Sequence, residues 1–418
     1  MRRPELDYIL TTMLDAAPDV SDLNFTIGKP LQVEAAGQLQ VVDCDPHITK
    51  LTPFQNECIA LNLLGENQWH IEDLLTKGSC DSAYTVADKA RFRINIFSQR
   101  GNYSIVLRKL STEIPSLNQL NLPPILRELP KVKTGLVLVT GATGSGKSTT
   151  LAAVLDEVNR TKSVHVITLE DPVEFVYAHE KATFNQRELG TDFEEFADGL
   201  RAALRQAPKI ILVGEMRDRE TVKIALSAAE TGHLVLSTLH TIDAGQTINR
   251  ILGMFDPDEQ DQIRIRLADV LRWVVSQRLV PKIGGGRFPL VEVMGTNLRT
   301  QESIRLGEAE GKTFFEIIEA SYPFGWRTFD HACLEAYEKA IITEETALIS
   351  CTKRGPVARG IDNLKKQRGE YTSNISALRM RSAAEAAAEA AGAPPLMPPP
   401  LDAPPTLPPT LPPTLNLK

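Results

Sequence analysis

A glycine-rich octapeptide constrains the fold of this chain more than any other stretch. Residues 141–148 read Gly-Ala-Thr-Gly-Ser-Gly-Lys-Ser and satisfy every fixed position of the phosphate-binding pattern G-x-x-x-x-G-K-[ST]. The apolar run 135–140 precedes it, as expected of a buried parallel strand, and 147–160 follows it with apolar residues at helical spacing. The order of strand, glycine loop and helix predicts an α/β domain with a phosphate site at this turn.

The residue types of the octapeptide suit a nucleotide and Mg²⁺. Glycines let backbone N–H groups close around phosphate oxygens, and the amino end of the following helix adds partial positive charge. Lys147 is expected to reach the β- and γ-phosphates, and the Ser148 hydroxyl to bind Mg²⁺. The predicted nucleotide-binding residues are Gly141, Ala142, Thr143, Gly144, Ser145, Gly146, Lys147, Ser148 and Thr149.

Length and composition limit the remaining possibilities. A chain of 418 residues is long enough for two or three domains, and its formal net charge of −7 gives no reason to expect nucleic acid as a partner. No apolar run approaches the roughly 20 residues that span a bilayer, and the amino end lacks the apolar core of a signal peptide. The five cysteines form no C-x-x-C pair, so they predict no zinc site. We expect a cytoplasmic protein with at most peripheral membrane contact.

Four segments differ in composition. Residues 1–110 combine short helical and alternating stretches and predict an α+β domain on a small sheet. The proline-containing residues 111–130 predict a linker, and 131–370 predict an α/β nucleotide-binding domain that ends in helices. Residues 371–418 are rich in Ala and Pro, repeat PPTL three times, and predict a disordered tail that is either merely solvated or docks a partner.

Three further strands are expected after the phosphate loop, at 164–169, 209–213 and 233–239, and polar residues follow each of them. Open α/β sheets place their ligands at the carboxyl ends of parallel strands. Helices are expected at 193–206, 221–231, 244–254 and 261–279, with a further strand at 290–294.

Acids and a histidine stand at these strand ends. Glu215 follows the apolar strand 210–213 in the Walker B position, where it would orient Mg²⁺-bound water or accept a proton from the attacking water. Glu170 and Asp171 point in different directions, so one can face Mg²⁺ while the other caps a turn or pairs with arginine. His240 is either a satisfied polar group or a residue that senses the γ-phosphate by a hydrogen bond.

Arginines alternate with apolar residues in the first domain. Arg91, Arg93 and Asn95 share one face of the strand 91–97, because Phe92, Ile94 and Ile96 take the other. This face is either solvated or offers its arginines to phosphates, as arginine fingers do. Arg108, on the next strand, extends the same set.

Taken together, four motifs resemble the secretion-ATPase superfamily and, within it, the PilT-like type IV pilus retraction ATPases. They are GATGSGKST (141–149), ITLEDPVEF (167–175), IILVGEMRD (210–218) and AETGHLVLSTLHT (229–241). The resemblance extends from about residue 5 to about residue 360. It implies a PAS-like N-terminal α+β domain, a RecA-like P-loop ATPase domain with a mainly parallel sheet, and a hexameric ring.

The resemblance also implies roles for single residues. Glu215 would be the catalytic glutamate, with Glu170 and Ser148 as further metal-binding residues. His233 and His240 would help to bind the nucleotide and sense its γ-phosphate, and Lys147 would act on the phosphates. Arg91, Arg93 and Arg108 would complete the site from the N-terminal domain. ATP and Mg²⁺ are the implied cofactors, and an inner-membrane pilus platform protein and a paralogous pilus ATPase are implied partners.

Two departures from the family pattern leave the exact role open. The further N-terminal domain and four-cysteine zinc element of pilus-assembly members are missing, which favours the retraction branch. Residues 298–305, however, keep only Ile304 and Arg305 of the AIRNLIRE-like motif, and the proline tail is atypical. The function indicated is ATP-driven pilus retraction, by the main motor or an accessory paralogue. The alternatives are an ATPase of a related secretion or DNA-uptake system, and a regulatory ring subunit.

Overall fold

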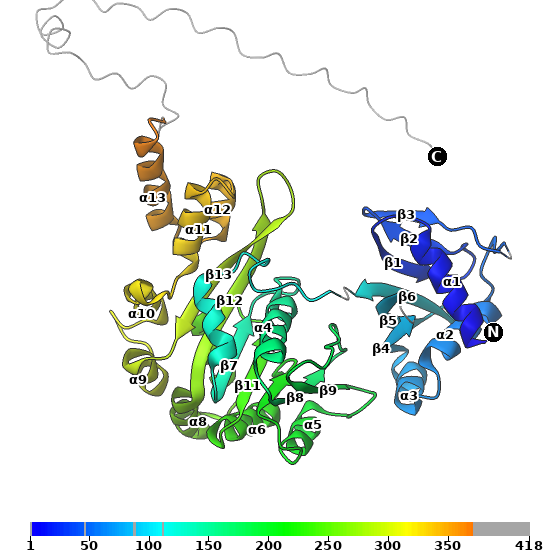
Figure 1. Cartoon of the computed structure of the whole chain (residues 1–418), viewed down its shortest axis with the longest axis horizontal. Coiled ribbons are helices and arrows are strands. Elements are labelled where there is room, and N and C mark those ends of the chain that lie inside the picture. Colours follow the sequence, from blue (N-terminus) through cyan, green and yellow to red (C-terminus); the bar gives the residue numbers. More distant parts are fainter. Residues whose placement is uncertain (1, 46, 87–88, 111–112, 371–418) are drawn as a thin grey trace, which may run out of the picture. The chain divides into compact units, whose positions relative to one another are not determined.

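The computed structural model describes residues 2–45, 47–86, 89–110 and 113–370. Residues up to Leu364 form one compact unit, which contains both β-sheets (Figure 1). The predicted disordered tail, 371–418, lies outside the described residues. Over the described ranges, every helix is too short or too polar to cross a membrane.

The first sheet is antiparallel and has six strands in the order β3-β2-β1-β6-β5-β4. Three helices accompany it, and their apolar side chains share its core. The strands are β1 (Val20–Phe25), β2 (Gln32–Ala35), β3 (Gln38–Val41), β4 (Ser79–Val86), β5 (Ala90–Gln99) and β6 (Asn102–Leu110). The helices are α1 (Arg3–Asp15), α2 (Pro53–Leu64) and α3 (Gln68–Lys77).

The strand β5 follows its sequence pattern closely. Phe92, Ile94 and Ile96 are fully buried, whereas the alternate residues Arg91, Arg93 and Asn95 are partly or fully exposed. This alternation is what a half-buried strand requires, because successive side chains point to opposite faces. The arginines therefore lie on the face of the sheet turned away from its core.

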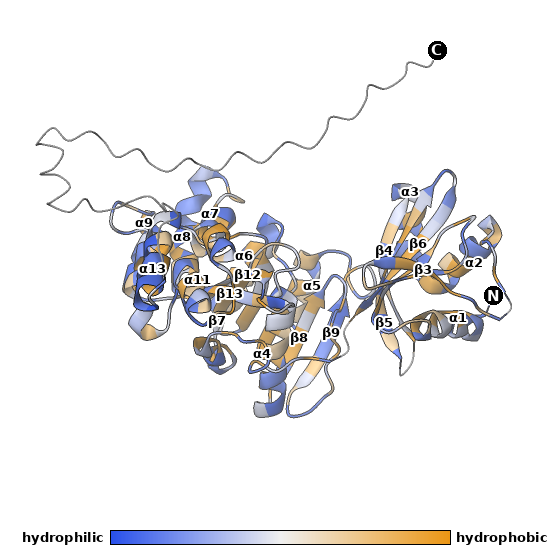
Figure 2. Cartoon of the chain, turned by 90° about the horizontal axis from the view of Figure 1, so that it is seen from above, coloured by the Kyte–Doolittle hydropathy of each residue, from blue (hydrophilic) through white to orange (hydrophobic). Residues whose placement is uncertain are grey.

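The second sheet has seven strands in the order β13-β12-β7-β11-β10-β8-β9, and only the pair β12–β13 is antiparallel. This confirms the predicted α/β fold with a mainly parallel sheet. The strands are β7 (Gly135–Thr140), β8 (His165–Glu170), β9 (Thr183–Glu188), β10 (Ile210–Val213), β11 (Leu234–Leu239), β12 (Leu271–Pro281) and β13 (Arg287–Gly295). In Figure 2 the central strands are mostly orange, whereas β9 at the sheet edge carries more polar residues.

Helices cover both faces of this sheet. In the central strand β7, Leu136 and Leu138 pack with α5–α8 on one face, and Val137 and Val139 pack with α4 and η1 on the other. A strand buried on both faces needs a continuous apolar run, which is what residues 135–139 provide. The helices named here are η1 (Pro124–Lys131), α4 (Lys147–Thr161), α5 (Phe196–Ala203), α6 (Arg219–Glu230), α7 (Ala244–Leu252) and α8 (Pro257–Val270).

Short helices follow β13: the buried residues of the first two belong to the core on the α5–α8 face of the sheet, whereas those of the last three form a separate small core with β12 and β13. They are α9 (Leu298–Leu306), α10 (Phe314–Ala320), η2 (Tyr322–Phe324), α11 (Phe329–Glu338), α12 (Glu344–Ser350) and α13 (Arg354–Gln367). The predicted linker region also packs on the larger domain, because Leu126 and Leu129 of η1 are buried in the core beside α4.

The predicted helix 261–279 is wrong. The helix α8 ends at Val270, and the next eleven residues form the strand β12 between β7 and β13. Apolar residues such as Leu267, Leu271 and Val274 are also spaced as on a helix, so the periodicity alone did not separate the two. Pairing with two strands decides the conformation, since β propensity depends strongly on tertiary context.

Truncation in the central strand is expected to destabilise the second sheet. Leu138 is fully buried, so Leu138→Ala should lower the free energy of unfolding by about 2–5 kcal/mol. Leu298→Ala is the matched control: that side chain is 83% exposed, and its loss should change stability by about 0.5 kcal/mol or less. Urea denaturation followed by tryptophan fluorescence measures both. Equal midpoints for the two variants would contradict this packing.

Candidate functional site

A cavity of about 510 Å³ lies where the parallel strands end and the glycine loop begins. Its walls come from the loop, from the residues that follow β8, β10 and β11, and from the β12–β13 hairpin. Among the lining residues are Arg93, Thr143, Gly144, Gly146, Lys147, Ser148, Thr149, Glu170, Asp171, Glu215, Arg217, His240, Leu279 and Arg287.

The glycine loop takes a conformation that side chains would prevent. Gly141, Gly144 and Gly146 have φ angles of 145°, 75° and 91°, in the region that favours glycine. A Cβ at Gly141 would also collide with the carbonyl oxygen of Gln277 on β12. The Ser145 hydroxyl is buried and has no hydrogen-bond partner within the described ranges, as expected of a group that a ligand can engage. The predicted residues 141–149 thus form one loop around the amino end of α4.

Lys147 folds back over this loop. Its Nζ donates to the carbonyl oxygens of Gly141, at 2.9 Å, and Ala142, at 3.0 Å, and its side chain is largely buried. Burial lowers the pKa of Lys147, while the negative charges of Glu215 and Glu174 act in the opposite direction. The two acids favour the charged ammonium, and a charged lysine at a glycine loop is suited to bind phosphate oxygens.

Glu215 is the centre of a charged group at the end of β10. Its carboxylate binds the guanidinium of Arg217, and Nε2 of His240 lies 3.5 Å from Glu215 Oε2. Burial alone would raise the pKa of Glu215, but the hydrogen bond and charge of Arg217 lower it below its ordinary value, with help from His240 and Lys147. Burial and the charge of Lys147 lower the pKa of His240. The arrangement keeps an ionised carboxylate beside a neutral imidazole.

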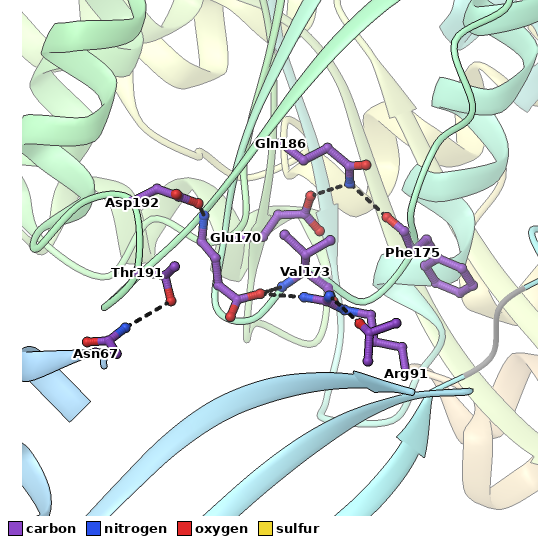
Figure 3. Close-up of polar contacts among 10 residues, drawn as sticks. Asn67, Arg91, Glu170, Val173, Phe175, Gln186, Thr191 and Asp192 are labelled. Carbon is purple, nitrogen blue, oxygen red and sulfur yellow. Dashed lines mark hydrogen bonds and ion pairs between the residues drawn. The ribbon is translucent and has the colours of Figure 1, made fainter. Parts of the chain in front are cut away.

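Glu170, the last residue of β8, lies next to this group but has a different environment. Burial raises its pKa to about 7, against the opposing effect of a hydrogen bond from Gln186. Gln186 Nε2 on β9 lies 3.3 Å from Glu170 Oε1 (Figure 3). Its neighbour Asp171 pairs with Arg217 at 3.5 Å instead, so the two adjacent acids do face different partners.

The donor set of the cavity fits Mg²⁺. The Ser148 hydroxyl and the carboxylates of Glu170, Asp171 and Glu215 all line it, and hard oxygen ligands are those that Mg²⁺ prefers. Within the described ranges, His, Cys, Asp and Glu side chains form no cluster of three or more that would hold a metal unaided.

Of the predicted site residues, Gly141, Ala142 and Ser145 belong to the loop but not to the cavity lining, and Arg91, Arg108 and His233 lie outside both. Arg91 pairs with Glu188 at 2.7 Å, and Arg108 pairs with Asp22 at 2.9 Å. His233 precedes β11 and so stands at the amino end of that strand, whereas His240 follows its carboxyl end; His233 Nδ1 lies 2.9 Å from the carbonyl oxygen of Ala228. Of the three predicted arginines, Arg93 lines the cavity.

Sequence reasoning missed four residues that shape the site: Arg217, Gln186, Gln277 and Leu279. Arg217 could have been predicted from the sequence, because it stands two residues after Glu215, where a strand has just ended. Gln277 donates to Thr150 Oγ1 at 2.9 Å, and Leu279 lines the cavity, but the incorrect helix prediction for this stretch hid both. Gln186 lies on a strand that was not predicted.

Fold and site together define a P-loop nucleotide-binding protein of the α/β type. The family model for type II/IV secretion system proteins matches residues 81–387. The chain is 38% identical to the type IV pilus retraction ATPase PilT of Pseudomonas aeruginosa, over 82% of this chain and 97% of that protein. It is 37% identical to the type IV pilus ATPase PilU of the same organism, over 82% and 88%.

A crystal structure of the pilus retraction motor PilT with bound ADP superposes with a TM-score of 0.75 at 41% identity, over 84% of this chain and 98% of that chain. The chain therefore belongs to the type II/IV secretion system protein family and is a PilT-like ATPase. The resemblance drawn from the four sequence motifs is confirmed.

The pairing of Glu215 with Arg217 predicts a pH effect. In Arg217→Gln the carboxylate loses the cation that lowers its pKa, while its burial remains, so that pKa should rise. Protonated Glu215 cannot accept a proton, and the acid limb of the pH profile of kcat should therefore move to higher pH.

The measurement is steady-state ATP hydrolysis across pH, with Arg201→Gln as control. Arg201 lies on α5 in exposed pairs with Asp198 and Glu220, so its variant should keep the wild-type profile. An acid limb that stays in place in Arg217→Gln would show that Arg217 does not set the protonation of Glu215.

Proposed function

We propose that this chain is the ATP-hydrolysing motor of type IV pilus retraction. The observation that carries the proposal is the meeting of Lys147, Glu215 and His240 in one cavity beside the glycine loop. Binding of ATP alone would need only the glycine loop and Lys147, whereas hydrolysis of ATP also needs a carboxylate that can activate water. The names and functions of the PilT and PilU relatives support pilus retraction as the work that hydrolysis drives.

Each residue of the site has a separate role in ATP hydrolysis. Backbone N–H groups of 141–149 and the ammonium of Lys147 bind the phosphates of ATP. Ser148, Glu170 and Glu215 would hold Mg²⁺, which would supply positive charge beside the phosphates. Glu215, ionised because of Arg217, accepts the proton of the attacking water. His240 donates a hydrogen bond toward the γ-phosphate, and Arg93 adds positive charge from the first sheet.

The proposal also covers the domains of the chain, its assembly and its partners. The first sheet and its helices (1–110) act as a PAS-like domain, 111–130 as the linker, 131–370 as a RecA-like motor domain, and 371–418 as a disordered tail. Six copies assemble into a ring, which works in the cytoplasm at the inner-membrane face of the pilus base. Its partners are an inner-membrane platform protein and a paralogous pilus ATPase. Sequence identity over nearly the whole length of PilT supports this assignment.

Genetic complementation tests the proposed role in pilus retraction. A deletion strain should lose twitching and become hyperpiliated, and the wild-type gene should restore both properties. Lys147→Ala should restore neither, because it removes the ammonium of the phosphate site. Lys77→Gln, which removes an exposed lysine of an i,i+4 pair on α3, is the control and should complement fully. Normal piliation combined with lost secretion would contradict retraction.

A further inference from the structure

Arg91 makes contacts that leave little of its guanidinium free for a phosphate. Nε donates to the carbonyl oxygen of Val173 at 3.0 Å, Nη1 to Thr85 Oγ1 at 3.2 Å, and Nη2 to Glu188 Oε2 at 2.7 Å. The side chain is only 20% exposed, and that of Glu188 only 11%. In a shielded pair of this kind, removal of one partner leaves the other charge buried and unpaired, which is far more costly than in an exposed pair. Arg108, by contrast, is 71% exposed in its pair with Asp22.

Glu188 connects Arg91 to the loop that follows β8. Its Oε2 also accepts a hydrogen bond from the backbone N–H of Val173, at 3.1 Å. Both backbone groups of Val173 are thereby engaged, its N–H by Glu188 and its carbonyl by Arg91 (Figure 3). The backbone N–H of Glu188 donates to Asp192 Oδ2 at 2.8 Å, which fixes the end of β9 from the other side.

Gln186 stands two residues before Glu188 and fixes the rest of the same loop. It donates to the carbonyl oxygen of Phe175 at 2.7 Å and accepts from the N–H of Tyr177 at 3.0 Å. Residues 173, 175 and 177 are thus bonded through their backbones to side chains of β9. Pro172, Glu174, Phe175 and Tyr177 line the nucleotide cavity. A change in this loop is therefore a change in the cavity wall.

A second contact joins the same parts of the chain just beyond β9. Asn67, which also caps α3, donates to the carbonyl oxygen of Gly190 at 2.9 Å. The ring of His70 lies against Gly190 so closely that a Cβ there would be 2.8 Å from Nε2. The first sheet and its helices thus touch β9 and the turn after it at two separate places, through Arg91 and through Asn67.

We infer that Arg91 is a positioning residue, which acts through Glu188 and Val173 to hold the loop 171–177 in place as a wall of the nucleotide cavity. It ties the strand β5 to this wall and does not itself bind phosphate. Arg93, two residues along the same strand, faces the cavity in its place. The role of Arg91 is thus different from the one the family resemblance implies, and only its kinetic test rests on the proposed ATP hydrolysis.

A double-mutant cycle tests this assignment. The variants are Arg91→Gln, Glu188→Gln and the double variant, with Lys89→Gln as control. Lys89 precedes β5 and pairs with Asp15 on the surface, so its variant removes a nearby positive charge without touching the loop. Two readouts are needed: hydrogen exchange of the amides in 173–178, and kcat/KM for ATP.

Each single variant should speed exchange in 173–178 and lower kcat/KM by about tenfold, because the loop loses its fixed geometry. The double variant should be within about twofold of the less active single variant in both readouts, since both changes break the same Arg91–Glu188 pair. Lys89→Gln should match the wild type. Asn67→Ala, which leaves the Arg91 contact intact, should speed exchange at 189–192 and spare 173–178.

Two results would overturn the inference. One is wild-type exchange in 173–178 when Arg91 is replaced. The other is a double variant whose loss is the product of the single losses, about a hundredfold, as for residues that act independently. A wild-type protein without ATP hydrolysis would refute the proposed function instead, and the exchange data alone would then decide on Arg91.

Discussion

The parallel register of the second sheet is the constraint on which the rest of the site depends. Val213 pairs with Leu169 on one side and with Ser237 on the other, and Leu239 pairs with Thr140. The strands β7, β8, β10 and β11 therefore end at nearly the same level. The residues that end or follow them, Gly141, Glu170, Glu215 and His240, meet at one edge although up to a hundred positions separate them. A single backbone arrangement thus brings loop, acids and histidine into one cavity.

The antiparallel hairpin β12–β13 completes this edge. Gln277 supplies the carbonyl oxygen against which Gly141 packs, and its side chain bonds Thr150 on α4. Leu279 and Arg287 extend the hairpin into the cavity wall. The glycine loop is consequently held between its own helix and a strand that comes more than a hundred residues later in the chain. The conformation that suits phosphate is stabilised by tertiary contacts as well as by its glycines.

Sequence reasoning reached the local parts of this arrangement and missed the tertiary ones. The glycine loop, the strand that leads to Glu215 and the alternation around Arg91 are encoded within a few residues, and all three appear in the structure. The strand β12 was misread because its identity depends on pairing with β7 and β13. Arg91 and Arg93 could not be told apart in advance. They share a strand face, but Arg91 forms a shielded ion pair with Glu188, whereas Arg93 lines the cavity and has only an exposed ion pair with Asp81 at 3.7 Å.

The central claim is that the cavity hydrolyses ATP by means of Glu215. The most direct test compares binding and turnover in Glu215→Gln, which keeps the size of the side chain but removes its basicity. The account predicts that this variant binds ATP about as tightly as the wild type, while single-turnover hydrolysis falls at least about a hundredfold. Hydrolysis at the wild-type rate with unchanged ATP binding would contradict it.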